Sequence, residues 1–202
     1  MIPVQALDFY EDLENDNSKA FWTAHKGVYD TAVKAPMEAL AAALAPEFGQ
    51  GKLFRPYRDV RFAKDKTPYK THQGIWFEDS SRYVQVSAAG LFVAAGYWRT
   101  STEQVARLRR AVADDVHGPA LERAIAACKG FALGGDTLTR VPSGYAKEHP
   151  RADLLRHKTL TLSKDVGCPA WLTTPRATAQ ITTLLRGMAP VVEWLDVRVG
   201  RD

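Results

Sequence analysis

The sequence of 202 residues has few cysteines and no long apolar run. No stretch approaches the roughly 18 apolar residues that a membrane span needs, so we expect no transmembrane segment and no membrane partner. The only cysteines, Cys128 and Cys168, form no C-x-x-C motif, which excludes a disulfide scaffold. Residues 1–5 have no basic segment followed by an apolar stretch, so we expect no secretory signal. These absences predict a cytoplasmic protein with both thiols reduced.

The sequence also lacks the short motifs of the common enzyme classes. It contains no G-x-x-x-x-G-K-[ST], no G-x-G-x-x-G, no G-x-S-x-G and no H-E-x-x-H. The five histidines do not have the spacing of metal ligands, so we expect no metal site and no cofactor. The motifs leave open whether the protein is an enzyme.

The composition, in contrast, is that of a folded protein. With 46% hydrophobic and 25% charged residues, the chain can build a sizeable core and is not mostly disordered. Its length suits a single domain over residues 1–202. We predict a helical region over 1–50, a strand-rich centre over 51–99, and helices with a few strands over 100–202. This order predicts an α+β fold, with a mainly antiparallel central sheet packed by N-terminal, middle and C-terminal helices.

Local patterns predict where helices begin. Apolar residues at helical spacing indicate a helix over residues 4–14. Thr100, followed three residues later by Glu103, has the pattern of a capping box. The last long helix is predicted to open at Thr174 and to carry a continuous apolar stripe, with a kink at Pro190.

Other patterns predict strands. Residues 83–87 and 91–95 alternate as strands do, and residues 88–90 make a hairpin connection between them. Gly96 suits a bulge or a close backbone contact. A further strand is predicted over residues 137–141.

Charge is concentrated in one segment, residues 55–70. The chain has 27 Lys+Arg and 23 Asp+Glu, a net charge of +4. The segment alone holds six basic side chains against two acidic ones, Asp59 and Asp65. The basic residues are Arg55, Arg58, Arg61, Lys64, Lys66 and Lys70. Two acids cannot neutralise six cations, so some of these cations must face water, remote acids or an anionic ligand.

The first interpretation of this segment is an anion site. Guanidinium groups bind carboxylate or phosphate oxygens in pairs, and lysines add point charges. We therefore expect a small phosphorylated or carboxylated ligand in a cleft around residues 55–72. The expected ligand-binding residues are Arg55, Arg58, Arg61, Lys66, Tyr69 and Lys70. The candidate bases of a hydrolase or transferase are His72, whose neutral form the neighbouring cations favour, and Asp59.

Two other interpretations stay open. The segment can be an ion-paired brace between the helical region and the sheet of a non-catalytic protein. A nucleic-acid-associated protein is a less favoured alternative, because it would need a longer basic stripe with interleaved aromatic residues. A brace predicts that alanine at Arg55, Arg58 or Arg61 lowers stability. An anion site predicts that at least one of the three replacements leaves stability unchanged or higher and removes stabilisation by phosphate.

The same segment resembles the hallmark of a known family. Residues 55–72 match R-x-Y-R-D-x-R-F-x-x-D-K-x-P-Y-K-[TS]-[HN] at every specified position. This pattern is similar to the core of a conserved, uncharacterised family of bacterial and fungal proteins, a domain of unknown function. Residues 15–29 resemble its N-N-x-x-x-W-F-x-x-N-K-x-x-Y element, with the aromatic pair inverted and His25 in place of an asparagine. Residues 140–155 resemble its P-x-G-Y…H-P…L-L element. The resemblance covers nearly the whole chain and implies no particular activity.

Overall fold

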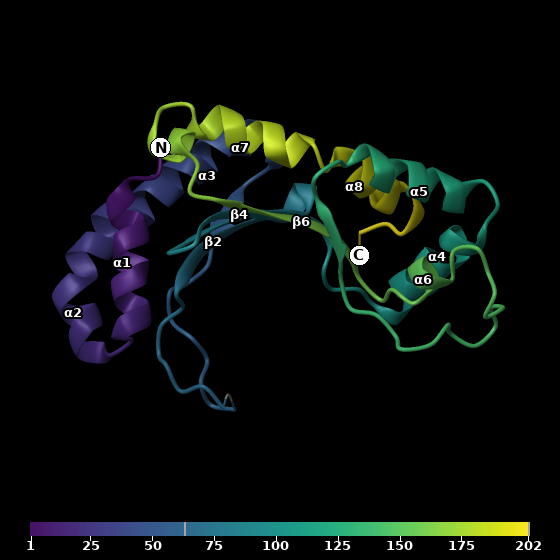
Figure 1. Cartoon of the computed structure of the whole chain (residues 1–202), viewed down its shortest axis with the longest axis horizontal. Coiled ribbons are helices and arrows are strands. Elements are labelled where there is room, and N and C mark those ends of the chain that lie inside the picture. The colour runs from purple at the N-terminus through teal and green to yellow at the C-terminus, as the bar shows by residue number, and fades with distance from the viewer. Residues whose placement is uncertain (63, 202) are drawn as a thin grey trace. The chain divides into compact units, whose positions relative to one another are not determined.

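The computed structural model describes residues 1–62 and 64–201, and it contains helices and a six-stranded sheet (Figure 1). The α+β class with a mainly antiparallel sheet is therefore confirmed. Ala63, inside the predicted basic segment, and Asp202, at the end of the predicted domain, lie outside the described residues. None of the helices described is both long enough and apolar enough to cross a membrane.

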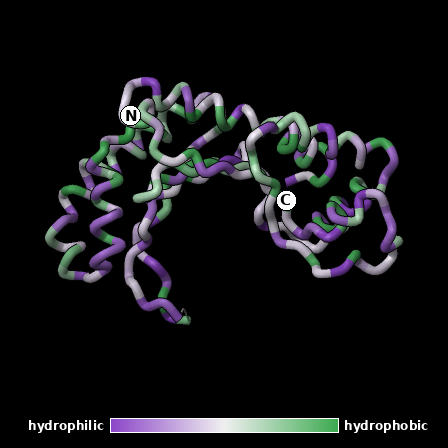
Figure 2. The backbone as a smooth tube through the Cα atoms, viewed as in Figure 1, coloured by the Kyte–Doolittle hydropathy of each residue, from purple (hydrophilic) through white to green (hydrophobic). Residues whose placement is uncertain are grey.

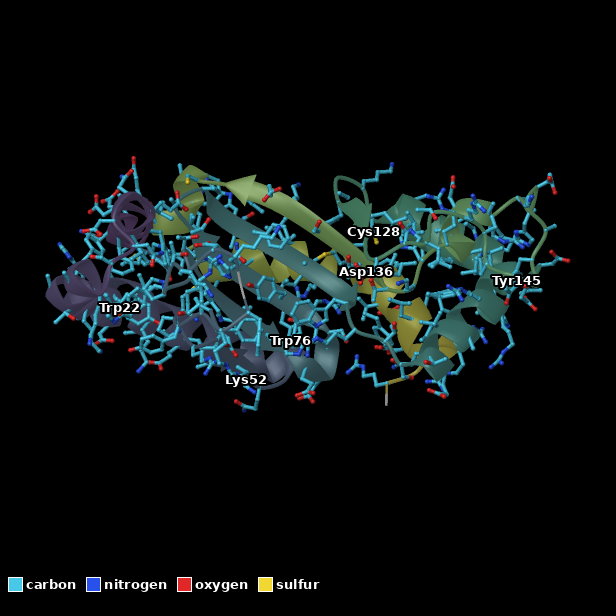
Figure 3. The ribbon with its side chains drawn as sticks, turned by 90° about the horizontal axis from the view of Figure 1, so that it is seen from below. Trp22, Lys52, Trp76, Cys128, Asp136 and Tyr145 are labelled. Atoms are coloured by element: carbon cyan, nitrogen blue, oxygen red, sulfur yellow. The ribbon has the colours of Figure 1, made fainter. Side chains whose placement is uncertain are left out.

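The strands follow the order β1-β2-β3-β4-β6-β5. Their bounds are β1 Gly51–Leu53, β2 His72–Phe77, β3 Arg82–Ser87, β4 Gly90–Tyr97, β5 Ala132–Gly134 and β6 Leu160–Gly167. The register of β1 on β2 places Lys52 opposite Trp76, and both residues are labelled in Figure 3. Buried and half-buried residues alternate along β3, as period-2 patterning requires.

The chain divides into two compact units. Unit 1 contains residues 1–93 and 165–184, and unit 2 contains residues 94–164 together with the described residues from Leu185 onward. Strands β4 and β6 contribute residues to both units.

In unit 1, helices pack against strands β1, β2 and β3. Its helices are α1 Val4–Asn15, α2 Lys19–Val28, α3 Ala35–Phe48 and most of α7 Ala177–Arg186. The predicted first helix is confirmed as α1. Helix α3 packs against β1 and β2, and α1 packs against β3. The core between them is almost fully buried, with Tyr10, Met37, Leu44, Ile75, Phe77 and Val84 at 0–1% exposure.

A π-helical segment, Tyr29–Lys34, joins α2 to α3 without a break. Pro36 lies in the first turn of α3, a position that proline favours. The π segment buries Tyr29 and Val33. It therefore continues the apolar face of the helical region instead of ending it.

Unit 2 is a group of helices beside β5 and parts of β4 and β6. The helices are α4 Thr102–Ala113, α5 His117–Ala127, α6 Ala152–Leu155 and α8 Ala189–Arg198. Helix α4 packs against the other three, and α5 also packs against α8. In β4, Gly96 has φ +117°, and a Cβ at this position would collide with the carbonyl oxygen of Leu160. The close backbone contact expected at Gly96 is present.

Three local predictions are wrong in detail. The capping box of α4 lies one residue later than predicted: the Ser101 hydroxyl accepts from the Gln104 N–H, and the Gln104 side chain accepts from the Ser101 N–H. Both registers carry the pattern, but Gln104 is buried and its amide also donates to the Gly200 carbonyl at 2.9 Å. An ionised glutamate in place of Gln104 would have no proton to donate to the Gly200 carbonyl.

The predicted single C-terminal helix is two helices, α7 and α8. A turn at residues 187–188 interrupts the helix, and Pro190 occupies the first turn of α8. The strand predicted over residues 137–141 is reduced to one bridge, between Thr137 and His157. The nearby strand is β5, which is earlier in the sequence and pairs with β6.

A buried arginine completes the C-terminal end of α4 in unit 2. Arg151 is 7% exposed and donates to the carbonyl of Val112 at 2.6 Å. It also donates to the carbonyls of Ala113 and Asp114, each at 3.2 Å. Among the described residues, the carboxylate nearest to it is that of Asp115, which is 3.6 Å away and fully exposed. The guanidinium fork thus serves helix-terminal carbonyl groups that have no partner within the helix.

We expect Arg151→Met to lower the free energy of unfolding by about 3 kcal/mol, because it leaves the carbonyls of buried Val112 and half-buried Ala113 without this donor. Arg151→Lys should recover little of this loss, since an ammonium group does not reproduce the planar fork. Urea denaturation measures both variants, with the exposed Arg123→Met as the matched control. A change below about 0.5 kcal/mol in Arg151→Met would contradict the capping role.

Candidate functional site

The basic segment is a closed loop between β1 and β2 in unit 1 (Figure 1). Its two arms meet at an antiparallel bridge between Tyr57 and Tyr69. The Arg58 N–H donates to the Pro68 carbonyl at 2.9 Å, and the Lys70 N–H donates to the Pro56 carbonyl at 2.8 Å. Most of the loop has hydrophilic colours in Figure 2. The prolines and the bridge together give the loop a defined base.

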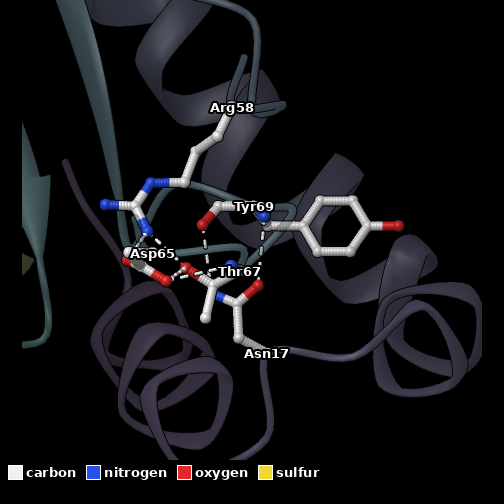
Figure 4. Close-up of polar contacts among 5 residues, drawn as sticks. All are labelled: Asn17, Arg58, Asp65, Thr67 and Tyr69. Atoms are coloured by element: carbon white, nitrogen blue, oxygen red, sulfur yellow. Dashed lines mark hydrogen bonds and ion pairs between the residues drawn. The ribbon is translucent and has the colours of Figure 1, made fainter. Parts of the chain in front are cut away.

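The loop is attached to the helical region by the side-chain amide of Asn17, which lies between α1 and α2 (Figure 4). Asn17 Nδ2 donates to the Tyr69 carbonyl at 3.0 Å, and Asn17 Oδ1 accepts from the Tyr69 N–H at 3.0 Å. The amide thereby satisfies both backbone groups of one residue, as a neighbouring strand would.

Aromatic rings support the same attachment. The ring of Tyr69 stacks on Trp22 of α2 at a centroid distance of 4.2 Å and an interplanar angle of 7°. Both side chains are buried, and Trp22 is labelled in Figure 3. Tyr57 lies beside them, with its ring 6.0 Å from Trp22 and 5.6 Å from Tyr69, and it is 48% exposed. Tyr69, predicted as a ligand-binding residue, is placed in a structural stack.

Two of the predicted arginines are paired with acids of the loop. Arg58 forms an ion pair with Asp65 and also donates to the Thr67 hydroxyl (Figure 4). Arg61 forms a two-point pair with Asp59, at 2.9 Å from Nε to Oδ1 and 2.7 Å from Nη2 to Oδ2. All four charged groups are exposed, so these pairs contribute little net stability and mainly shape the loop.

Lys66 is also used within the loop, because its ammonium group donates to the Val60 carbonyl at 2.9 Å. Asp65 accepts from both the N–H and the hydroxyl of Thr67, which fixes the turn before Pro68. Three of the six predicted ligand-binding cations and aromatics, Arg58, Arg61 and Lys66, therefore have partners inside the loop.

Arg55 and Lys70 are different. Neither side chain makes an ion pair with any residue that the structure describes. Lys70 is half-buried and lies over the Phe54 ring at 5.3 Å. Partial burial and then the positive charge of Arg55 lower the pKa of Lys70. The two cations are electrostatic neighbours at the base of the loop.

His72 continues this group at the first position of β2. Burial lowers the pKa of the His72 imidazole, and the charges of Lys70 and Arg58 lower it further. Its ordinary value is 6.5, so the ring is neutral at neutral pH. A neutral imidazole has one nitrogen that can accept a proton.

Asp59, the other predicted base, has the opposite character. Hydrogen bonds from the Arg61 side chain and backbone lower the pKa of its carboxyl group, and Arg55 adds to the effect. A carboxylate with a lowered pKa is a weaker base at neutral pH. The arrangement favours His72 over Asp59 for proton transfer.

A buried hydrogen-bond chain lies behind the loop and was not predicted from the sequence. The Tyr29 hydroxyl donates to Gln73 Oε1 at 2.8 Å, and Gln73 Nε2 donates to the Phe54 carbonyl at 2.7 Å. The roles of Asn17 and Trp22 were not predicted either. Asn17, Trp22 and Tyr29 all fall in the N-N-x-x-x-W-F…Y element of the helical region. The presence of this element in the same chain as the basic motif was the available signal.

The structure brings no three potential metal ligands together among the residues it describes. The cationic residues at the loop base suit oxyanions instead, because guanidinium and ammonium groups donate hydrogen bonds and accept none. The arrangement can hold an anion and can offer a neutral imidazole beside it.

Fold and site thus define an α+β protein whose basic loop is held to its N-terminal helices by one asparagine and one aromatic stack. The chain belongs to the DUF2461 family of conserved hypothetical proteins, whose family model matches residues 5–194. The resemblance to an uncharacterised family is confirmed. No curated protein and no solved structure matches the chain.

We expect Asn17→Ala to lower the free energy of unfolding by about 2 kcal/mol, because the backbone groups of buried Tyr69 lose both partners. Asn15→Ala is the matched control, since the Asn15 amide bonds only to an exposed carbonyl of its own helix. Urea denaturation followed by tryptophan fluorescence reports the change through Trp22. Equal stability of the two variants would contradict the attachment role.

His72 gives a prediction of pH dependence. Its pKa is lower in the folded than in the unfolded protein, so the unfolded chain binds the proton first as the pH falls. Its contribution to stability is complete above pH 6.5 and is lost as the pH falls through the folded-state value. Urea denaturation from about pH 7.5 to about pH 5 should therefore show a steeper loss in the parent than in His72→Gln. Parallel curves would contradict the lowered pKa.

Proposed function

We propose that unit 1 binds a small phosphorylated or carboxylated molecule at the base of the loop, with Arg55 and Lys70 as its anion-binding groups. The observation that carries this proposal is the absence of an acidic partner for either cation in the described part of the chain. The acids of the loop are already used by Arg58 and Arg61. An anion would therefore supply the negative charge that this end of the loop lacks.

Electrostatics at Lys70 supports the proposal. Its charge is held half-buried next to Arg55, an arrangement that costs free energy in the absence of an anion. A bound phosphate or carboxylate removes that cost, because an opposite charge at short range favours the charged form of both groups. The same anion also favours a protonated His72.

The proposed site includes a group for proton transfer. If the ligand is a substrate, His72 is the base or acid of a hydrolase or transferase, and Asp59 is the weaker second candidate. Arg55 and Lys70 would stabilise negative charge that develops on the reacting group. Whether a reaction takes place is decided by an assay with phosphate and carboxylate esters, not by the presence of the cations.

A second candidate function, a structural brace, is favoured for part of the loop by a specific observation. Arg58 and Arg61 pair with Asp65 and Asp59, so this part of the segment is ion-paired, as the brace interpretation expects. Both pairs stay within the loop and join no second element, so they shape the loop itself. Steeply salt-dependent binding of DNA or RNA would instead favour the nucleic-acid alternative.

The discriminating variant is Arg55→Ala. Because Arg55 lies beside another cation, its loss should leave the free energy of unfolding equal to or above that of the parent. In the parent, inorganic phosphate or malonate at constant ionic strength should raise the pKa of His72, followed by imidazole NMR signals assigned with His72→Gln. The rise should disappear in Arg55→Ala and in Lys70→Ala.

The matched control is Arg176→Ala, which removes an exposed arginine from the segment before α7 in the same unit. It should keep the response of His72 to anions. The proposal fails if no anion shifts His72 in the parent, or if Arg55→Ala is destabilised as a brace residue would be.

A further inference from the structure

Unit 2 contains a pocket of about 320 Å³ lined by residues of α4, α5 and α8 and of the turn before α5. The charged and ionisable residues of its wall are Arg107, Arg110, Asp114, His117 and Arg198, and Ala111 and Val197 add apolar surface. Three arginines thus converge on one hollow that contains a single carboxylate.

The frame of the pocket is tied together by hydrogen bonds between its helices. Arg107 Nε donates to the carbonyl of Val199, at the end of α8. Trp194 Nε1, on α8, donates to the carbonyl of His117 at 3.0 Å, at the start of α5. These bonds join α4 and α5 to the same helix, so the wall of the pocket is organised before any ligand arrives.

The one carboxylate of the pocket is already occupied. Asp114 Oδ1 accepts from the N–H groups of Val116 and His117, each at 2.8 Å. These two hydrogen bonds, above all the one from His117, lower the pKa of Asp114. Asp114 therefore stays ionised and holds the turn between α4 and α5. Its charge can offset at most one of the two cations Arg110 and Arg198.

Arg110 and Arg198 are the side chains with unused donors. Both are exposed, and neither makes an ion pair or a side-chain hydrogen bond within residues 1–62 and 64–201. Each lies in the last turn of its helix, where a cation complements the helix dipole. The dipole explains a cation at each helix end, but it does not require that both line one pocket.

We propose that this pocket is a second anion site, which binds the phosphate group of a small phosphorylated molecule between Arg110 and Arg198. A guanidinium fork donates two parallel hydrogen bonds to a phosphate, and two forks suit a dianion. Ala111 and Val197 supply apolar surface for the part of the ligand that carries the phosphate.

Titration of the full chain with inorganic phosphate at constant ionic strength, followed by two-dimensional NMR of backbone amides, tests this proposal. The amides of residues 110–117 and 197–199 should shift saturably with one dissociation constant. In Arg110→Ala and in Arg198→Ala this constant should increase by roughly tenfold or more, the equivalent of one lost charge-assisted hydrogen bond.

Two control variants keep the result specific. Arg123→Ala removes an exposed arginine elsewhere on α5 and should leave the dissociation constant unchanged. Arg55→Ala, which removes the site proposed in unit 1, should also leave these shifts intact, so the two sites succeed or fail separately. Thermal unfolding of each variant without phosphate verifies that it is folded.

Three outcomes would overturn the proposal. Shifts that chloride reproduces at the same ionic strength would show screening without a site. Shifts that survive in the Arg110→Ala, Arg198→Ala double variant would place binding elsewhere. Equal saturation by malonate would remove the assignment to a phosphate group.

Discussion

The loop of unit 1 depends on one neutral side chain, the amide of Asn17. It satisfies the N–H and the carbonyl of Tyr69 together, and Tyr69 is the residue whose ring stacks on Trp22. Lys70 and His72 follow directly in the chain, so their positions are inherited from this attachment. An aspartate of the same size would offer acceptors only and would leave the carbonyl of Tyr69 without a donor. Because this attachment uses a neutral side chain, it does not depend on which partners the charged side chains of the loop have.

The charges of the loop are sorted by distance along the chain. Asp59 is two residues from Arg61, and Asp65 is seven residues from Arg58. Each acid therefore pairs with an arginine of the same loop. Arg55 precedes all the acids and Lys70 follows them, and the bridge between Tyr57 and Tyr69 brings these two ends together. Arg58 and Arg61 thus have acidic partners within the loop, whereas Arg55 and Lys70 lie together at its base without one among the residues described.

Features that depend on neighbouring residues could be predicted from the sequence. The first helix, the connection between β3 and β4 and the concentration of charge all follow from short-range patterns. The cap of α4 could not be placed, because two registers carry the same pattern and burial of Gln104 decides between them. Local patterns could not pair Asn17 with Tyr69, because 52 residues separate the two. The sequence also could not show which arginines of the loop pair with its acids, because the pairing depends on the folded conformation of the loop.

The π-helical segment between α2 and α3 restricts how the N-terminal region can change in length. It aligns Tyr29 with Gln73 at one end while Met37 and Leu44 remain in the core at the other. One residue of an α-helix corresponds to a rotation of about 100°. Deleting a single residue from the segment would therefore turn the buried side of α3 toward solvent, or else turn Tyr29 away from Gln73. Insertions and deletions in this part of the chain are expected to be tolerated only outside the continuous run Lys19–Phe48, in the turn before α2 or after Phe48.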